Sequence, residues 1–180
     1  VTSSDETNLI IAISSKLLHR DVMVICRSDD KVHEENMLSF GTDHIINPYE
    51  SFAEVFSMSL HSPSMHLIYD WLTGAPNTSL STPVNIDEGH WILSGYGRLG
   101  RELHEALRER NIRTVIIDPR KKVKNEFANN TQTDDDFIAG IGTDAETLTR
   151  AGIDTAAGVI AGTDNDSNNL SIIMTPRQLN

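Results

Sequence analysis

Glycines spaced as GxGxxG, at residues 95–100, are the part of this sequence whose types and spacing point most directly to chemistry. An apolar run at residues 90–94 predicts a strand before them, and residues 101–110 have the pattern of a helix after them. A glycine-rich turn between a strand and a helix is typical of sites where backbone N–H groups and the helix dipole hold nucleotide phosphates. The candidate cofactor-binding residues of this turn are Gly95, Tyr96, Gly97, Arg98, Leu99 and Gly100.

The three glycines of this turn have separate expected roles. Gly95 allows the tight turn out of the strand, Gly97 lets a pyrophosphate approach the backbone, and Gly100 lets the helix pack on the sheet. These roles predict that the anion is held mainly by the backbone and not by a lysine side chain.

A carboxylate, Asp118, ends the next apolar run at about the twenty-residue distance that a dinucleotide site requires. We expect it to accept hydrogen bonds from ribose hydroxyls and to repel a 2′-phosphate, which favours NAD or an adenine nucleotide over NADP. Arg120, a second candidate binding residue, weakens that exclusion. We also expect Asp118→Ala to weaken nucleotide binding while leaving thermal stability nearly unchanged.

The charge of the chain argues against a nucleic-acid partner. The net charge is −11 and the isoelectric point is near 4.9, so no basic stripe is available to bind a phosphate backbone. The single basic cluster, Lys121, Lys122 and Lys124, is interpreted as a solvated loop, with contact to a phosphate as the alternative. Cys26 stands alone in an apolar run, which predicts a buried, inert thiol in a reducing compartment. We predict neither a membrane span nor a signal peptide, and hence a cytoplasmic protein.

Strand and helix patterns alternate along most of the chain. After Asp118, strands are expected at 136–139 and 157–161, a helix at 144–151, and a last helix after a cap at 163–166. Before the glycine turn, the expected helices are 5–19, 31–40 and 51–60, and the expected strands are 22–27 and 44–46. The sequence therefore predicts an α/β fold, a doubly wound Rossmann-like parallel sheet with helices on both faces.

Residues 5–11 resemble residues 166–172, an internal match at an offset of about 160 residues. The two segments therefore correspond to the same position in two copies of one fold. We interpret 1–62 as the C-terminal half of a first domain, 63–88 as a linker with a short helix at 65–72, and 89–180 as the N-terminal part of a second.

The two half-domains leave three arrangements open. They could complete one another within one chain, or between two chains, or each could be completed by segments outside this sequence. Completion of one by the other predicts a hybrid sheet, with four strands from residues 89–163 and two from residues 22–47.

The chain resembles the TrkA-N family, also called RCK or KTN, the cytosolic nucleotide-binding regulatory domains of potassium channels and transporters. The resemblance is carried by GYGRLG at 95–100, Ile117-Asp118-Pro119, the stretch at 140–143, GTDNDSNNLSII at 162–173, and DETNLIIA at 5–12. It implies a tandem-domain member, with further binding residues at Gly142, Thr143, Thr163 and Asp164.

The resemblance also implies partners. These are NAD(H), with ADP, ATP or another adenine nucleotide as alternatives, a second copy in a dimer or larger ring, and the membrane subunit of a potassium channel or transporter. The expected place is the inner face of the membrane, through a linked or associated pore. One departure concerns Ile141, which stands where the family usually has an aspartate and offers apolar contact to the base instead.

The leading hypothesis for function is a regulatory module and not an enzyme. The alternative is a fragment of an NAD-dependent oxidoreductase, which needs a general acid or base in a substrate domain that the sequence does not contain. A purely structural assembly module is the third hypothesis. No catalytic residue is proposed, and the spacing of the histidines and acidic clusters predicts no metal site.

Overall fold

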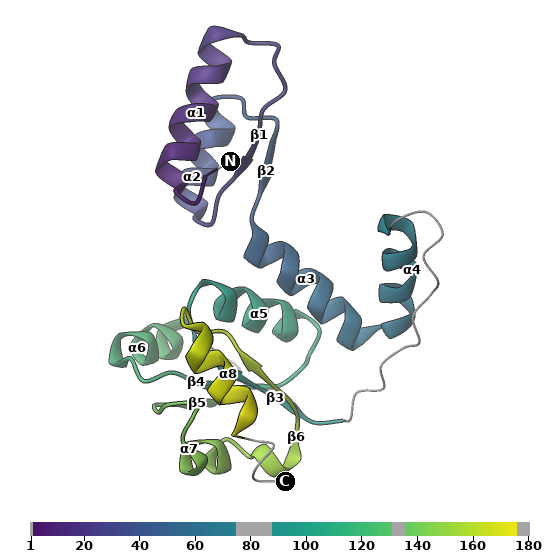
Figure 1. Ribbon diagram of the computed structural model, residues 1–180, viewed down its shortest axis with the longest axis vertical. Helices are drawn as coiled ribbons and strands as arrows, with labels where there is room; N and C mark the ends of the chain where they lie inside the picture. The colour runs from purple at the N-terminus through teal and green to yellow at the C-terminus, as the bar shows by residue number, and fades with distance from the viewer. Residues whose placement is uncertain (1, 75–87, 131–135, 176–180) are drawn as a thin grey trace. The chain divides into compact units, whose positions relative to one another are not determined.

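The computed structural model describes residues 2–74, 88–130 and 136–175, and Figure 1 shows the arrangement of its helices and strands. The chain divides into two compact units, Val1–Phe52 and Ala53–Asn180, which are described separately below.

The first unit is a parallel two-stranded sheet with two helices. Its elements are α1 (Asp5–Leu18), β1 (Ile25–Arg27), α2 (Lys31–Ser39) and β2 (His44–Ile46), followed by the start of α3 (Pro48–His61). Cys26 pairs with Ile45 across the two strands, and both pack against α1 and α2 in a small core with Ala12 and Met37. Cys26 is 6% exposed, so its predicted burial is confirmed.

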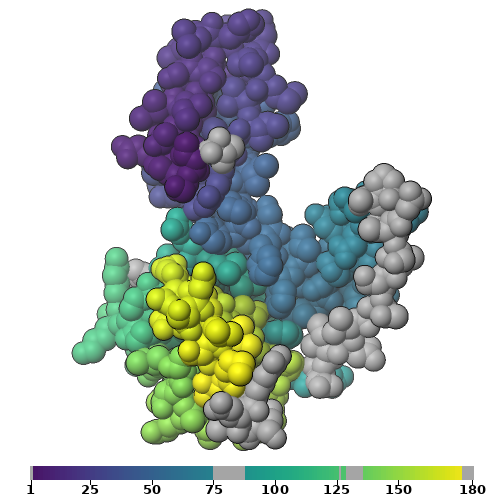
Figure 2. Space-filling view, viewed as in Figure 1, coloured from purple at the N-terminus to yellow at the C-terminus, as the bar shows by residue number. Residues whose placement is uncertain are grey.

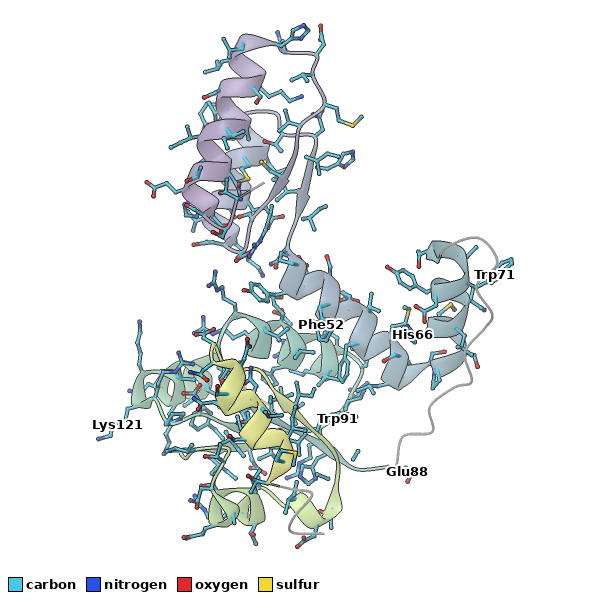
Figure 3. The ribbon with its side chains drawn as sticks, viewed as in Figure 1. Phe52, His66, Trp71, Glu88, Trp91 and Lys121 are labelled. Carbon is cyan, nitrogen blue, oxygen red and sulfur yellow. The ribbon has the colours of Figure 1, made fainter. Side chains whose placement is uncertain are left out.

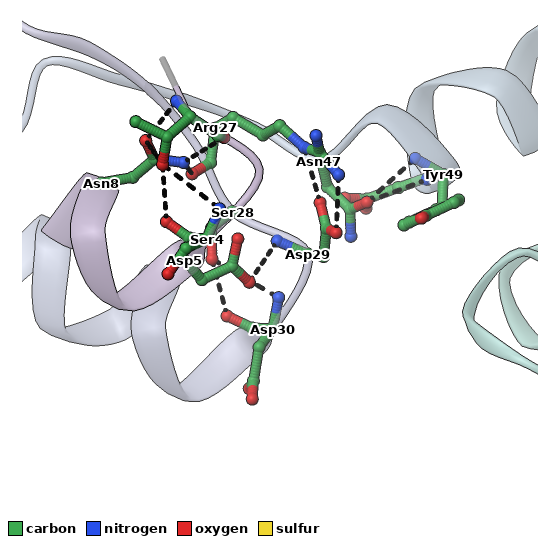
Figure 4. A network of polar contacts seen from close by, with 11 residues as sticks. Ser4, Asp5, Asn8, Arg27, Ser28, Asp29, Asp30, Asn47 and Tyr49 are labelled. Atoms are coloured by element: carbon green, nitrogen blue, oxygen red, sulfur yellow. Dashed lines mark hydrogen bonds and ion pairs between the residues drawn. The ribbon is translucent and has the colours of Figure 1, made fainter.

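A network of polar contacts holds the strand ends of this unit to the start of α1 (Figure 4). The Asn8 amide donates to the carbonyl oxygens of Thr2, at 3.0 Å, and Arg27, at 3.1 Å. The Arg27 guanidinium donates two hydrogen bonds to Asp29, whose backbone N–H donates to the Asp5 carboxylate. Buried polar groups thus fix where the chain leaves β1.

The second unit has a four-stranded parallel sheet in the order β5-β4-β3-β6. Its further elements are α4 (Pro63–Thr73), β3 (His90–Ser94), α5 (Arg98–Glu109), β4 (Thr114–Ile117), α6 (Lys121–Asn130), β5 (Asp136–Ile138), α7 (Ala145–Arg150), η1 (Ile153–Thr155), β6 (Ala156–Ala161) and α8 (Asp166–Met174). The central strand β4 is buried along its whole length, as expected for a strand covered on both faces.

Alternate side chains of the strands form two cores, one on each face of the sheet. On one face Leu93 and Ile116 pack with Leu103 and Leu107 of α5. On the other face Ile92 packs with residues of α7 and η1, among them Leu148 and Ile153. Trp91, labelled in Figure 3, makes an edge-to-face contact with Phe56 of α3, with ring centroids 5.5 Å apart. The α/β fold with helices on both faces of a parallel sheet is therefore confirmed.

Two helices of this unit expose apolar side chains. Helix α4 has no buried residue, and Trp71 points away from the rest of the helix into solvent (Figure 3). Helix α8, yellow in Figure 2, lies at the surface and exposes its residues Leu170 and Met174. Its residue Ile172 is buried.

The described strands form two sheets, one in each unit. The structure corrects two of the expectations from sequence. The lysines at 121–124 lie on helix α6 and not in a loop, because Val123 and Phe127, one turn apart, bury one side of it. The strand expected from residue 22 begins at Ile25, where pairing with His44 of β2 begins.

Candidate functional site

A pocket of about 310 Å³ opens at the carboxyl ends of the second unit's strands. The sheet order places β4 on one side of β3 and β6 on the other, and ligands of open α/β sheets bind at this reversal of strand order. The pocket is lined by Ser94, Gly95, Gly97, Ile117, Asp118, Pro119, Arg120, Ile141, Gly142, Thr143, Gly162, Thr163, Asp164, Asn168 and Ile172.

The glycine turn after β3 shapes one wall of this pocket. Gly95 has a φ of +104°, and a Cβ there would lie 2.8 Å from the Gly162 carbonyl oxygen, so the turn needs glycine. A Cβ on Gly100 would collide with the Gly95 carbonyl oxygen. A Cβ on Gly97 would meet no protein atom within 4 Å, and Gly97 lines the pocket. Gly95 and Gly100 are therefore required by the fold, and Gly97 leaves space for a ligand in the pocket.

Helix α5 begins at this turn without a side-chain cap. Its N-cap residue is Gly97, whereas Ser4, Asp144 and Asn165 cap α1, α7 and α8 with side-chain oxygens. The first-turn N–H groups of a helix have no acceptor within the helix, and together with the helix dipole they favour an anion. The start of α5 has the geometry of a phosphate site.

Asp118 lies at the end of β4 and is 2% exposed. Its carboxylate accepts hydrogen bonds from the backbone N–H of Tyr96 and of Arg120, each at 2.9 Å. The Arg120 side chain adds two more, from Nε at 2.9 Å and Nη2 at 2.7 Å. Burial alone raises the pKa of Asp118, but the hydrogen bonds from Arg120 and Tyr96 outweigh it, so that the pKa lies below its usual value. Asp118 is therefore an ionised acceptor at neutral pH.

Asn169 of α8 holds the opposite wall in place. Its Oδ1 accepts from the backbone N–H and the hydroxyl of Thr163, at 2.9 and 2.6 Å, and its amide donates to the Thr163 carbonyl at 2.9 Å. These three bonds fix the turn between β6 and α8, where Gly162, Thr163 and Asp164 line the pocket.

Ile141 lines the pocket with an apolar side chain that is 59% exposed. The next acid along the chain, Asp144, is not among the residues that line the pocket. It accepts from the N–H and the hydroxyl of Thr147 as the cap of α7, bonds that also lower its pKa. This part of the pocket therefore offers apolar contact in place of a carboxylate.

The pocket gathers most of the binding residues predicted from sequence. Gly95, Gly97, Asp118, Arg120, Gly142, Thr143, Thr163 and Asp164 all line it. Tyr96, Arg98, Leu99 and Gly100 are not among its lining residues. The Tyr96 side chain instead packs against Phe127, with its hydroxyl 3.0 Å from Nδ1 of His104.

Sequence reasoning did not propose as binding residues Ser94, Ile117, Pro119, Gly162, Asn168 and Ile172, which also line the pocket. Position was the available signal, because each lies next to a strand end or on the first turns of α8.

The described residues contain no group of three or more His, Cys, Asp or Glu side chains placed to hold a metal ion. Among the helices of these same residues, none combines the length and apolar character needed to cross a membrane.

Known proteins match this chain over the region of the pocket and beyond it. Residues 91–180 match the TrkA-N domain. "Probable potassium channel protein 2" of Methanocaldococcus jannaschii is 36% identical over 91 residues, which cover 51% of this chain and 26% of that protein. "Potassium channel protein 1" of the same organism is 34% identical over 93 residues, 51% of this chain and 27% of that protein. The chain thus spans about a quarter of these relatives.

Solved structures of GsuK resemble the fold over 98% of this chain. GsuK bound to ADP has a TM-score of 0.65 and 19% identity, and 38% of its chain is covered. The GsuK channel bound to NAD has a TM-score of 0.65 and 17% identity, and 42% of its chain is covered. At such identities the likeness establishes the fold, while the domain match covers half of the sequence. The chain belongs to the TrkA-N domain family.

Proposed function

We propose that this chain is a regulatory module that binds NAD(H) or another adenine nucleotide and controls potassium transport through a channel or transporter. The observation that carries the proposal is the pocket at the strand ends, with the uncapped start of α5, the open space at Gly97 and the ionised Asp118 around it. The potassium channel proteins of M. jannaschii and the NAD- and ADP-bound GsuK structures support it.

Each part of the pocket suits one part of a nucleotide. The start of α5 would hold phosphate oxygens with backbone N–H groups, and Gly97 would let them approach the backbone. Asp118 would accept from ribose hydroxyls, and Ile141 would offer an apolar surface to the base. A volume of about 310 Å³ lies at the lower end of the range of small-molecule sites.

The module acts as a sensor and not as an enzyme in this proposal. Hydride transfer requires a general acid or base beside the nicotinamide, commonly His, Lys or Tyr. The described residues that line the pocket include none of these three types. Binding free energy would instead favour one arrangement of the assembled domains over another, and the pore would respond to that arrangement.

The proposal includes the organisation of the chain. Residues 1–62 form the C-terminal half of one TrkA-N domain, 63–88 link the halves, and 89–180 form the N-terminal part of a second. The matching cap hydrogen bonds of α1 and α8 support this division. The module would assemble as a dimer or larger ring at the inner face of the membrane, through a linked or associated pore.

Calorimetry of the purified full-length protein with NAD, NADH, ADP and ATP tests the proposal. We expect heat of binding for at least one of the four. We expect Gly97→Ala to weaken that binding at least tenfold, since its Cβ would enter the space left for the phosphates. Its thermal unfolding temperature should stay within about 2 °C of wild type, because the Cβ touches no protein atom.

Gly100→Ala is the matched control for this experiment. Its Cβ would collide with the Gly95 carbonyl, so this variant should lose stability. The absence of heat for all four nucleotides would contradict the sensor, and turnover of NADH with small carbonyl substrates would support the oxidoreductase instead.

A further inference from the structure

The carboxylate of Asp118 has as many hydrogen-bond donors as it can accept. A carboxylate has about four acceptor positions, and Asp118 receives two bonds from backbone N–H groups and two from the Arg120 guanidinium. A ribose that donates its hydroxyls to Asp118 must therefore displace a donor that is already present.

The four donors differ in how easily they can leave. The backbone N–H groups of Tyr96 and Arg120 belong to the turns that follow β3 and β4, and moving them would disturb both turns. The guanidinium is carried by a long side chain that is 54% exposed and lines the pocket. It can turn into solvent without any change in the backbone.

We propose that the Arg120 side chain competes with the nucleotide for Asp118, and thereby sets the affinity of the pocket for a ribose that carries both hydroxyls. This inference rests on the proposed nucleotide-binding function. Binding exchanges two guanidinium N–H donors for two hydroxyl donors, so the net gain from the ribose is small. Because Arg120 is half exposed, the pair that must be broken is of the solvent-screened kind, and the competition lowers affinity without abolishing binding.

The first unit supplies a matched control. Arg27 donates to Asp29 through Nε at 2.9 Å and Nη2 at 2.7 Å, the same atoms and distances that join Arg120 to Asp118. The Asp29 side chain is also 2% exposed. Neither residue of this pair lines the pocket. Removal of Arg27, which is 31% exposed against 54% for Arg120, therefore breaks an ion pair of the same geometry without opening an acceptor to the nucleotide.

Calorimetric titration of the full-length protein with ADP and 2′-deoxy-ADP tests the competition. We expect Arg120→Ala and Arg120→Met, which keeps a long stem without donors, to bind ADP about three- to tenfold more tightly than wild type. The gain should be smaller for 2′-deoxy-ADP, which lacks one of the two hydroxyls. Arg27→Ala should leave the affinity for ADP within twofold of wild type.

A double-mutant cycle shows whether the gain acts through Asp118. In an Asp118→Asn background, Arg120→Ala should no longer tighten ADP binding. Equal or weaker ADP binding by both single Arg120 variants overturns the competition and leaves the proposed function standing. If neither wild type nor the variants bind ADP or NAD, the proposed function fails, and this inference fails with it.

Discussion

The two units share one pattern of polar contacts before a helix, and in the second unit that pattern stands beside the pocket described above. Thr163 and Asn169 stand 161 positions after Thr2 and Asn8, and each pair shares three hydrogen bonds: N–H to Oδ1, hydroxyl to Oδ1, and amide to carbonyl. Ser4 and Asn165, again 161 positions apart, cap the helices that follow.

The two Asn–Thr pairs differ in their surroundings. Asn8 also donates to the Arg27 carbonyl and is 1% exposed, so it joins two parts of the first unit. Asn169 is less buried, and the turn that it holds faces the glycine loop after β3. The Asn–Thr pair therefore stabilises the first unit, whereas in the second unit it also supports the wall of the pocket. Substitution of Asn8 should change mainly stability, and substitution of Asn169 should also change nucleotide affinity.

The largest expected effect is on the stability of the first unit. Asn8→Ala leaves the Thr2 N–H and the Arg27 carbonyl without their side-chain partner and opens a small cavity. We expect a loss of about 3 kcal/mol in the free energy of unfolding. Denaturant titration of the full-length protein measures it, and nucleotide affinity should change less than twofold. A loss of nucleotide affinity equal to that of Asn169→Ala would contradict the difference between the two units.

Asp118→Ala should have the next largest effect, and here the structure changes the expectation drawn from sequence. The substitution removes the acceptor of Tyr96 and Arg120, so we expect about 2 kcal/mol lower stability at pH 7 as well as weaker nucleotide binding. Asp29→Ala, its counterpart in the first unit, should lower stability and leave nucleotide affinity unchanged.

The stability lost in Asp118→Ala depends on pH. The folded-state pKa lies below the unfolded value of about 3.9, so the stabilisation is fully present above that value. It is lost as the pH falls through the folded-state pKa. Wild type and variant should therefore converge in stability below about pH 4, and a constant difference down to pH 2 would contradict the role of the ionised carboxylate.

Asn169→Ala should show a smaller loss of stability, about 1 kcal/mol, because Asn169 is itself less buried than Asn8. Nucleotide affinity should fall about fivefold, since Thr163 loses the bonds that orient it in the pocket wall. Calorimetry with ADP and thermal unfolding of the same protein measure both. Unchanged affinity would place Thr163 outside the binding surface.

Tyr96→Phe should have the smallest effect. It removes the hydrogen bond between the phenol and His104 but keeps the ring against Phe127, so we expect a loss of about 0.5–1 kcal/mol. The Tyr96 side chain does not line the pocket, and affinity for ADP should stay within twofold. A larger loss of affinity would indicate that the phenol reaches the ligand.

The sequence predicted the strands of the second unit and the residues that directly follow them. Continuous apolar runs ending in Gly95 and Asp118 are strong signals, because buried parallel strands need them and ligands bind at their ends. Helix α6 was missed, since only Val123 and Phe127 mark its buried side among lysines. Two buried positions in a basic segment do not make a recognisable helical period.

The pairing of Arg120 with Asp118 could not be predicted from residue types. Residues two apart meet only when the backbone between them turns, and here the Arg120 N–H donates to the same carboxylate as its guanidinium. Sequence placed both in the site and left their mutual contact open. The hydrogen bonds of Thr163 likewise depend on the turn before α8, although the repeat of its neighbours was visible.

The buried thiol of Cys26 can report on the opening of the first unit. The thiol is the single cysteine of the sequence, and it lies 3.4 Å from the Asn8 carbonyl within the small core. A thiol-specific reagent can reach it when this core opens, so the rate of labelling counts opening events in one unit without any engineered probe. Repeating the labelling with added nucleotide would then show whether a ligand bound to the second unit slows or speeds the opening of the first.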